Sequence, residues 1–216
     1  MTAKRRILLV RHGETEWNSA FRFQGRTDVP LSENGRAQAS LLAERLADCC
    51  FDRVFSSPLS RACETARIVI KGHQGVELTT LGELSEMSFG EWESLTISEV
   101  REKDPGFFAS WRENPSELTA PGGEPFEGLI ARVGSAIEGI LASGGETLLV
   151  VCHGGTIRAA LSALIGVSPQ AAWKFRVDNC SITAIDITEE RTTLRYANDA
   201  VHLKMKPGEA GRVPVM

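Results

Sequence analysis

The sequence has few of the features that mark an exported or membrane protein. Its N-terminus, MTAKRR, is followed by the apolar run Ile7 to Val10, which is far too short for a signal-peptide core or a membrane span. The 5 cysteines form an odd set without a CxxC pair, which favours reduced thiols over a disulfide framework. We therefore expect a cytoplasmic protein that does not associate with membranes.

An excess of positive charge is also missing. The formal net charge is -4 over 216 residues, so the chain as a whole does not attract polyanions, and nucleic acid is not an expected partner. Neither an HExxH motif nor zinc-finger spacing occurs, so no metal or other cofactor is expected. The length suits a single domain over residues 1–216, and association into a homo-oligomer stays open.

Segments with strand and helix patterns alternate along the chain. Apolar runs predict strands at residues 7–10, 54–55, 78–81, 147–151, 181–187 and 192–196. Apolar residues at helical spacing predict helices at residues 32–47, 59–70, 126–141 and 156–164. This order predicts an α/β fold, a three-layer αβα sandwich around a mostly parallel sheet, with the ligand at the carboxyl ends of the strands.

Residues 83–125 break this alternation. The segment is rich in aromatic residues and prolines, and we predict a lid insertion built of short helices. Its aromatic residues are expected either to form a small core of the lid or to touch the substrate; they are Trp92, Phe107, Phe108 and Trp111. Residues 204–216 have the composition of a mobile tail.

Two of the apolar strands end in a histidine followed by glycine. These histidines are His12, after Arg11, and His153, after Cys152. A glycine at this point lets backbone N–H groups and a bulky anion approach closely, and a helix that begins just after Gly155 offers its positive end to the anion. We predict that both histidines face one crevice and that Gly154 helps to bind phosphate.

Arginines accompany these histidines. Arg11 is a permanently charged, planar group suited to gripping phosphate oxygens, and Arg61 follows Ser-Ser-Pro at another turn from strand to helix. Arginines beside His12 should lower its pKa, which keeps a nitrogen lone pair free to attack phosphorus. Glu86, among apolar residues where the lid begins, is the candidate that protonates the leaving alcohol.

Six segments carry a resemblance to a known family: RHGETEWN (11–18), FQGRTDVPLSENG (23–35), SSPLSRACETA (56–66), ELSEMSFGEWE (83–93), PGGE (121–124) and CHGG (152–155). In this order they resemble the phosphoglycerate-mutase-like branch of the histidine phosphatase superfamily over residues 6–203. The resemblance implies that His12 is phosphorylated, that Arg11, Arg61 and His153 bind the phosphoryl group, and that Glu86 is the proton donor. It also implies phosphate or substrate contacts by Asn18, Gln24 and Gly25.

The sequence departs from the family in two places. Mutase relatives carry adjacent arginines in a longer insertion, whereas Arg101 and Arg112 are isolated here. Ser94 stands where many phosphatase relatives have glycine. The resemblance therefore favours alpha-ribazole and broad-specificity phosphatases, which implies metal-independent hydrolysis of a small phosphomonoester. A cofactor-dependent phosphoglycerate mutase is the alternative, followed by a non-catalytic module that binds phosphorylated ligands.

A second phosphatase chemistry also has a sequence match. Cys152 to Arg158 satisfies the C-x5-R pattern of thiolate phosphatases, but this hypothesis leaves RHGET and the Arg61 segment unexplained. A metallohydrolase is disfavoured because Arg11 adjoins His12 and would repel a cation. The remaining histidines, His73 and His202, are expected to be structural or solvated.

Overall fold

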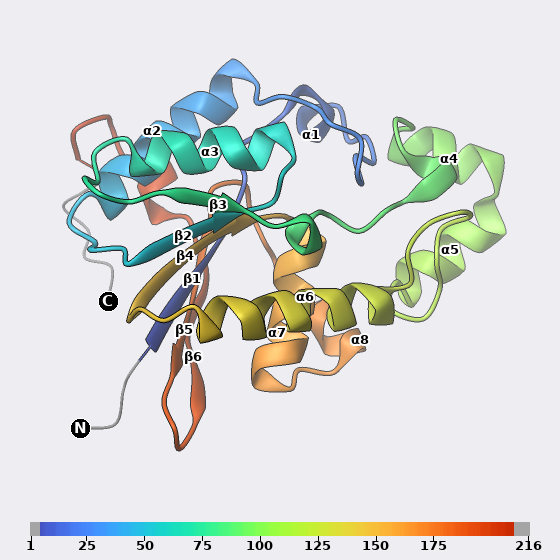
Figure 1. Cartoon of the computed structure of the whole chain (residues 1–216). Coiled ribbons are helices and arrows are strands. Elements are labelled where there is room, and N and C mark those ends of the chain that lie inside the picture. Colours follow the sequence, from blue (N-terminus) through green and yellow to red (C-terminus); the bar gives the residue numbers. More distant parts are fainter. Residues whose placement is uncertain (1–4, 210–216) are drawn as a thin grey trace.

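The computed structural model describes residues 5–209, and these contain one six-stranded sheet in the order β3-β2-β4-β1-β5-β6. The strands are β1 (Arg5–Arg11), β2 (Arg53–Ser56), β3 (Leu78–Thr80), β4 (Thr147–Cys152), β5 (Ile182–Ile187) and β6 (Thr192–Asp199). The first four strands are mutually parallel, whereas β5 and β6 are antiparallel additions at one edge. The sheet is therefore mostly parallel, as predicted (Figure 1).

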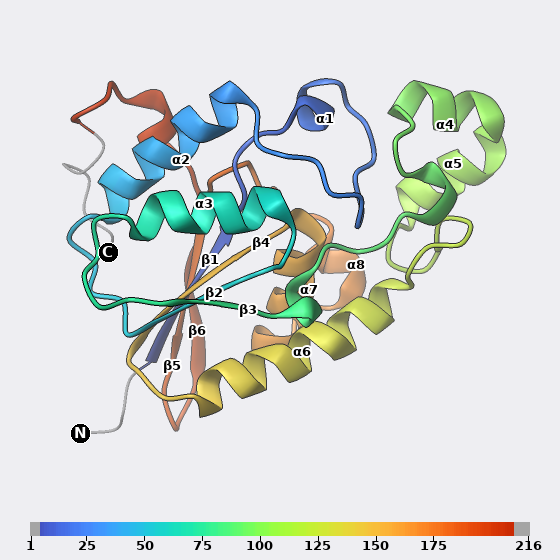
Figure 2. The same ribbon diagram turned by 45° about the horizontal axis from the view of Figure 1, so that its top comes forward.

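Helices cover both faces of the sheet. They are α1 (Glu16–Ser19), α2 (Glu33–Leu46), α3 (Ser60–Ile70), α4 (Ile97–Lys103), α5 (Pro105–Glu113), α6 (Phe126–Ala142), α7 (Gly154–Ile165) and α8 (Pro169–Ala172), with short 3-10 helices η1 (Gly82–Leu84), η2 (Gly90–Trp92) and η3 (Val201–Lys204). Figures 1 and 2 show α2 and α3 on one face and α6 and α7 on the other. This arrangement confirms the predicted three-layer sandwich.

The side chains of β1 explain why both faces need helices. Leu8 and Val10 belong to the cluster under α2 and α3, whereas Ile7 and Leu9 belong to the cluster under α6 and α7. Successive side chains of a strand point to opposite faces, so an unbroken apolar strand is stable only with apolar cover on both sides. The continuous apolar runs therefore specify central strands.

Several predicted boundaries need correction. The helix expected to start at Thr156 starts at Gly154, with His153 as its N-cap. The last strand continues to Asp199, beyond its predicted end at residue 196. Helices α1 and α8 were not predicted because each spans only 4 residues, too few to show a helical period.

The segment 83–125 holds η2, α4 and α5, which project from the sandwich at one end (Figures 1 and 2). Three of its four predicted aromatic residues, Trp92, Phe108 and Trp111, form a separate buried cluster with Val100 and Ala120. The segment thus has a small hydrophobic core of its own. Its movement as a lid stays a prediction.

Of the predicted tail, residues 210–216 lie outside the described residues. Before them, the backbone N–H of Gly208 donates to the Glu44 carboxylate.

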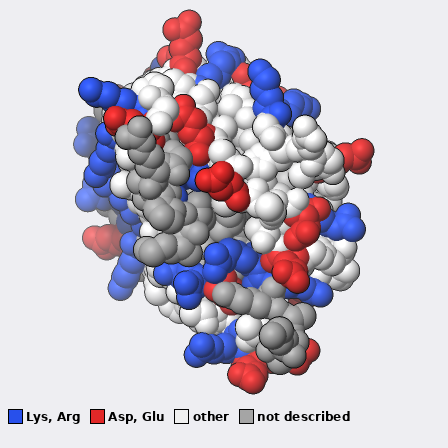
Figure 3. Space-filling view, turned by 90° about the vertical axis from the view of Figure 1, so that its left-hand side faces the viewer, with Lys and Arg blue, Asp and Glu red and all other residues white. Residues whose placement is uncertain are grey.

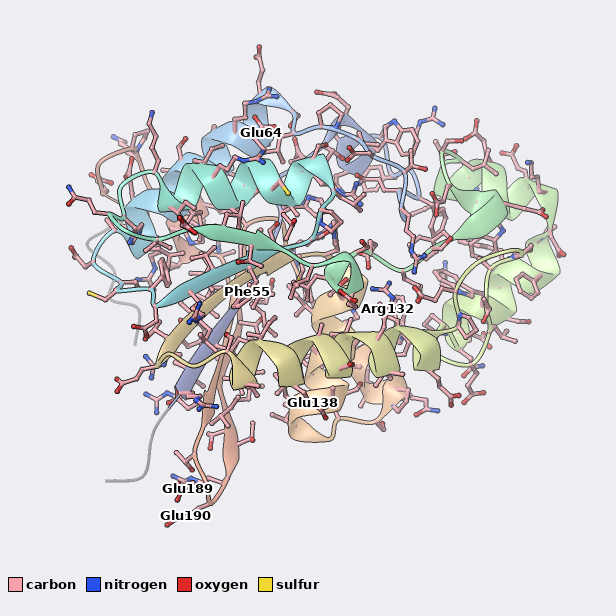
Figure 4. The ribbon with its side chains drawn as sticks, in the orientation of Figure 1. Phe55, Glu64, Arg132, Glu138, Glu189 and Glu190 are labelled. Atoms are coloured by element: carbon pink, nitrogen blue, oxygen red, sulfur yellow. The ribbon has the colours of Figure 1, made fainter. Side chains whose placement is uncertain are left out.

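Glu189 and Glu190 lie at the tip of the β5–β6 hairpin (Figure 4). On the side remote from α4 and α5, basic and acidic side chains are intermixed (Figure 3). Within residues 5–209, the helices are too short or too polar to cross a membrane.

Candidate active site

The two histidines of the repeated strand-end motif lie side by side. Strands β1 and β4 are parallel neighbours whose register pairs Arg11 with Cys152, so the next residue of each strand, His12 or His153, leaves the sheet at the same level. Their ring centroids are 5.1 Å apart, and both side chains are buried. Sheet register therefore brings together two residues that are far apart in the sequence.

The His12 ring has a defined orientation. Its Nδ1 lies 2.7 Å from the carbonyl oxygen of Gly13. A carbonyl only accepts, so Nδ1 carries the proton and the neutral ring keeps its lone pair on Nε2. Burial, followed by the charges of Arg61 and Arg11, lowers the pKa of His12 well below its ordinary value. His12 is thus a neutral imidazole with a lone pair on Nε2.

Arg61 faces that lone pair. Its Nε donates to His12 Nε2 at 3.3 Å, and its two terminal nitrogens donate to the carbonyl oxygens of Thr27 and Gly25. Burial lowers the pKa of Arg61 to about 10, so the group remains cationic at neutral pH. Gly25 has φ +54°, and a Cβ there would collide with the Glu93 carboxylate, so this position requires glycine.

His153 is the N-cap residue of α7. Its Nε2 is 2.7 Å from the Ser57 hydroxyl, and its buried Nδ1 has no hydrogen-bond partner within residues 5–209. Burial is the main cause that lowers its pKa, and the neighbouring Arg61 charge is the second. Because α7 starts at Gly154, the positive N-terminal end of the helix faces the same pocket.

The Glu86 carboxylate is docked on that helix end. It accepts hydrogen bonds from the backbone N–H groups of Gly155 at 3.1 Å and Thr156 at 3.2 Å, and from that of Met87. A Cβ on Gly155 would lie 2.5 Å from a Glu86 carboxylate oxygen. Glycine at this position therefore leaves room for the Glu86 carboxylate.

Arg132 of α6 holds the segment that carries Glu86, a role that no sequence pattern indicates. Its guanidinium donates to the carbonyl oxygens of Glu83, Ser85 and Glu86, and it pairs with Glu124 at 2.7 Å. In Figure 4, Arg132 lies between α6 and the segment at η1. Both PGGE and the proton-donor candidate are thus anchored to one helix.

A cavity of about 180 Å³ opens onto these groups. Eight predicted site residues line it: Arg11, His12, Asn18, Gln24, Gly25, Arg61, Glu86 and Gly154. His153 lies behind this lining, beside His12. The sequence prediction missed the other lining residues, which are Arg22, Phe23, Phe89, Gly155, Arg158 and Trp173. The apolar surface of the pocket thus comes from Phe23, Phe89 and Trp173, whereas Phe107, Phe108 and Trp111 do not line it.

One glycine has a different role from the predicted one. The backbone N–H of Gly13 donates to the Thr65 hydroxyl, and a Cβ on Gly13 would lie 2.5 Å from the carbonyl oxygen of Gly35 in α2. Close packing of β1 against α2 therefore requires this glycine. Gly154 lines the pocket, so the expectation that glycine gives an anion room stays a prediction there, whereas Gly13 is not among the residues that line it.

The structure argues against the thiolate hypothesis. Cys152 is fully buried in the apolar cluster under α6 and α7. Burial raises the pKa of its thiol, which opposes formation of the nucleophilic thiolate. Within residues 5–209, groups of three or more His, Cys, Asp or Glu side chains that could hold a metal ion do not occur.

Comparison with known proteins identifies the family. Residues 7–200 match the histidine phosphatase superfamily, branch 1, and the chain belongs to it. Phosphoserine phosphatase 1 of Hydrogenobacter thermophilus is 36% identical over 199 residues, which cover 92% of this chain and 94% of the relative. The adenosylcobalamin/alpha-ribazole phosphatase of Salmonella typhimurium is 37% identical over 194 residues, which cover 89% of this chain and 96% of the relative.

The fold agrees with that of a solved relative. The native structure of mycobacterial glucosyl-3-phosphoglycerate phosphatase superposes with a TM-score of 0.83 at 29% identity, covering 90% of this chain and 99% of that one. All three relatives are named as phosphatases. The resemblance found in the six sequence segments is therefore confirmed.

Proposed function

We propose that this chain hydrolyses small phosphomonoesters through a phosphohistidine on His12. The observation that carries the proposal is the orientation of the ring: Nδ1 donates to Gly13, and the Nε2 lone pair is directed at Arg61 in the pocket. A nucleophile needs a free lone pair, a fixed direction and a cationic site for the group it attacks. His12 has the direction and the cationic site, and its lone pair becomes free when Arg61 moves its hydrogen bond to the substrate.

In the first step, Nε2 of His12 attacks phosphorus while the bond from phosphorus to the leaving oxygen breaks. Arg61 moves its hydrogen bond from Nε2 to a phosphoryl oxygen, and Arg11 and His153 bind the others. The N–H of Gly154 and the positive end of α7 add to this stabilisation. Glu86 gives its proton to the leaving oxygen, so an alcohol departs.

In the second step, water attacks the phosphohistidine. A bond forms between the water oxygen and phosphorus, the N–P bond breaks, and a water proton passes to the Glu86 carboxylate. Inorganic phosphate leaves, and His12 and Glu86 return to their starting states.

Asn18, Gln24 and Gly25, which line the pocket, are proposed to contact phosphate or substrate. The arrangement needs no metal, so activity should persist in EDTA and be inhibited by vanadate.

A phosphoglycerate mutase is the alternative, since the same phosphohistidine could return its phosphoryl group to a retained product. Such a reaction requires the product to be held and water to be excluded. The isolated Arg101 and Arg112 of the lid favour release and hydrolysis. Incubation with 3-phosphoglycerate separates the two reactions: inorganic phosphate should outpace the 2-isomer, and faster formation of the isomer would contradict hydrolysis.

A protein that binds phosphorylated ligands without turnover is the lower alternative, and a stable phosphohistidine with no phosphate release would favour it. A screen of phosphomonoesters, including sugar phosphates, nucleotides and alpha-ribazole phosphate, tests for turnover directly.

We expect the enzyme to work in the cytoplasm, because its cysteines at positions 49, 50, 63, 152 and 180 are free. Self-association stays open.

A further inference from the structure

The Glu93 carboxylate, which has no part in the proposed mechanism, accepts five hydrogen bonds. Three come from a neighbouring loop: the backbone N–H of Arg26 at 3.2 Å, and the backbone N–H and hydroxyl of Thr27 at 3.0 and 2.6 Å. Two come from its own segment: the Ser88 hydroxyl at 3.2 Å and the Phe89 N–H at 3.1 Å. A carboxylate offers about four lone-pair sites, so these bonds use its accepting capacity in full. Glu93 is not among the residues that line the pocket, so it binds protein groups rather than a ligand.

The peptide groups that Glu93 holds are the ones that hold Arg61. The carbonyl of Gly25 and the N–H of Arg26 belong to one trans peptide, whose two polar groups point in opposite directions. The N–H donates to Glu93, and the carbonyl accepts from Arg61 Nη2 at 2.8 Å. Thr27 repeats this arrangement, because its N–H donates to Glu93 and its carbonyl accepts from Arg61 Nη1 at 2.9 Å. The loop therefore lies between a carboxylate and a guanidinium and fixes one relative to the other.

This support sets the direction of the Arg61 guanidinium. Both terminal nitrogens of the fully buried side chain donate to the loop, and its Nε meets His12 Nε2 at 3.3 Å. The charged and titratable groups around His12 are Arg61, Arg11, His153 and Glu86. The charges that lower the pKa of His12 are those of Arg61 and Arg11, whereas the Glu93 charge opposes the lowering of the pKa of Arg61. Glu93 therefore reaches His12 through Arg61.

We propose that Glu93 is a positioning residue for the hydrolysis: it holds the loop peptides that aim Arg61 at His12 Nε2 and at the phosphoryl group. An arginine side chain has several rotatable bonds, so an unsupported guanidinium would sample positions away from the phosphoryl oxygens. Charge-assisted bonds from a carboxylate to backbone N–H groups are strong supports for those peptides. The proposal rests on the proposed phosphatase function and adds a residue that acts through Arg61 without touching the substrate.

Glu93→Gln tests this proposal. Whichever way its amide is turned, the NH2 group replaces an oxygen that accepts from Arg26 or from Thr27, so the loop loses an acceptor for one of its N–H groups. We expect kcat/KM to fall by about 10- to 100-fold. The acid limb of its pH profile should move to higher pH, because a misplaced Arg61 lowers the pKa of His12 less.

The direction of this shift separates positioning from other roles of Glu93. Loss of a negative charge that acted directly on His12 would disfavour the imidazolium and move the acid limb to lower pH. A role in folding alone would lower the free energy of unfolding, measured in denaturant, and leave the acid limb in place. An acid limb that stays or moves to lower pH would therefore overturn the proposal.

Two matched variants test the two sides of the carboxylate. Thr27→Val removes the hydroxyl bond from the loop and should move the acid limb in the same direction by a smaller amount. Ser88→Ala removes a bond from the segment 83–125 and should leave the acid limb in place. In an Arg61→Gln background, Glu93→Gln should add no further shift, because the group that it positions is absent.

Equal shifts in Thr27→Val and Ser88→Ala, or a further shift in the double variant, would also overturn the proposal. These results leave the proposed function untouched, since each is measured on an enzyme that hydrolyses esters through a labelled His12. The proposed function fails separately, if esters are hydrolysed by the wild-type enzyme without a label on His12.

Discussion

Arg61 Nε lies 3.3 Å from His12 Nε2, and the same guanidinium is fixed by the carbonyl oxygens of Gly25 and Thr27. Those two residues belong to a loop that the Glu93 carboxylate ties to the lid, through the backbone N–H and hydroxyl of Thr27. Hydrogen bonds thus connect His12, through Arg61 and Thr27, to the segment 83–125. Changes at Arg61 should therefore affect both the binding of phosphate and the protonation of His12.

Replacing Arg61 should shift the pH dependence of the reaction. Arg61 lowers the pKa of His12, second only to burial, so Arg61→Gln should raise that pKa. Only neutral His12 attacks, so the acid limb of the pH profile of kcat/KM should move to higher pH, on top of a general loss of about 100-fold. Profiles of both enzymes on one substrate check this. An acid limb that stays or moves to lower pH would contradict the role of Arg61.

Glu86→Gln should discriminate between leaving groups. An alkyl phosphate needs a proton on its departing oxygen, whereas p-nitrophenolate leaves without one. We expect a loss of about 100-fold in kcat on the alkyl ester and of less than about 10-fold on p-nitrophenyl phosphate. Glutamine keeps the shape, and its one carbonyl oxygen can still accept from the N–H groups of Thr156 and Met87, which share Oε1, whereas the bond from Gly155 to Oε2 is lost. Equal losses on the two esters would show that Glu86 is not the proton donor.

Ser94→Gly should stabilise the protein. Ser94 has φ +72°, in the left-handed region that disfavours residues with a Cβ. Relief of this strain outweighs the greater flexibility of glycine in the unfolded chain, so the free energy of unfolding should rise by about 0.5–1 kcal/mol. Denaturant unfolding measures it, with kcat unchanged as the control. The backbone bond from the N–H of residue 94 to the Phe23 carbonyl is kept in the variant, so no gain in stability would contradict a cost of strain at this position.

Cys152→Ala should keep its activity within about threefold of wild type, because the thiol lies in the core and away from the pocket lining. Unfolding free energy should fall by about 1 kcal/mol for the small cavity. Steady-state kinetics and denaturant unfolding on the same preparation separate the two effects. A variant that is folded but inactive would revive the thiolate mechanism.

The sequence predicted the sandwich and the meeting of His12 and His153 for the same reason. Both depend on short-range patterns: apolar strands that need cover on two faces, and His–Gly pairs at the strand ends. Gly13 and Gly154 show where this reasoning stops. Each follows a strand-end histidine, but only the packing of α2 against β1 reveals that Gly13 contacts Gly35 while Gly154 faces the pocket.

Part of the pocket lining was not predictable from local patterns. Phe23, Arg158 and Trp173 come from three distant segments, and none stands in a pattern that marks a pocket. Arg158 was noticed only as the last residue of the C-x5-R match. Arg132 likewise acts through carbonyl oxygens of residues 83–86, which no sequence pattern encodes. These contacts depend on how α6, α7 and the lid come together.

The central claim is that His12 carries the phosphoryl group. Rapid mixing with a hydrolysed ester, quenching in alkali to preserve the phosphoramidate, and peptide mass spectrometry locate the label. His12 should be phosphorylated within a single turnover, at a rate sufficient for steady-state hydrolysis, and His12→Ala should show neither label nor turnover. Continued hydrolysis with no label on His12, or a label on another residue, would contradict the account.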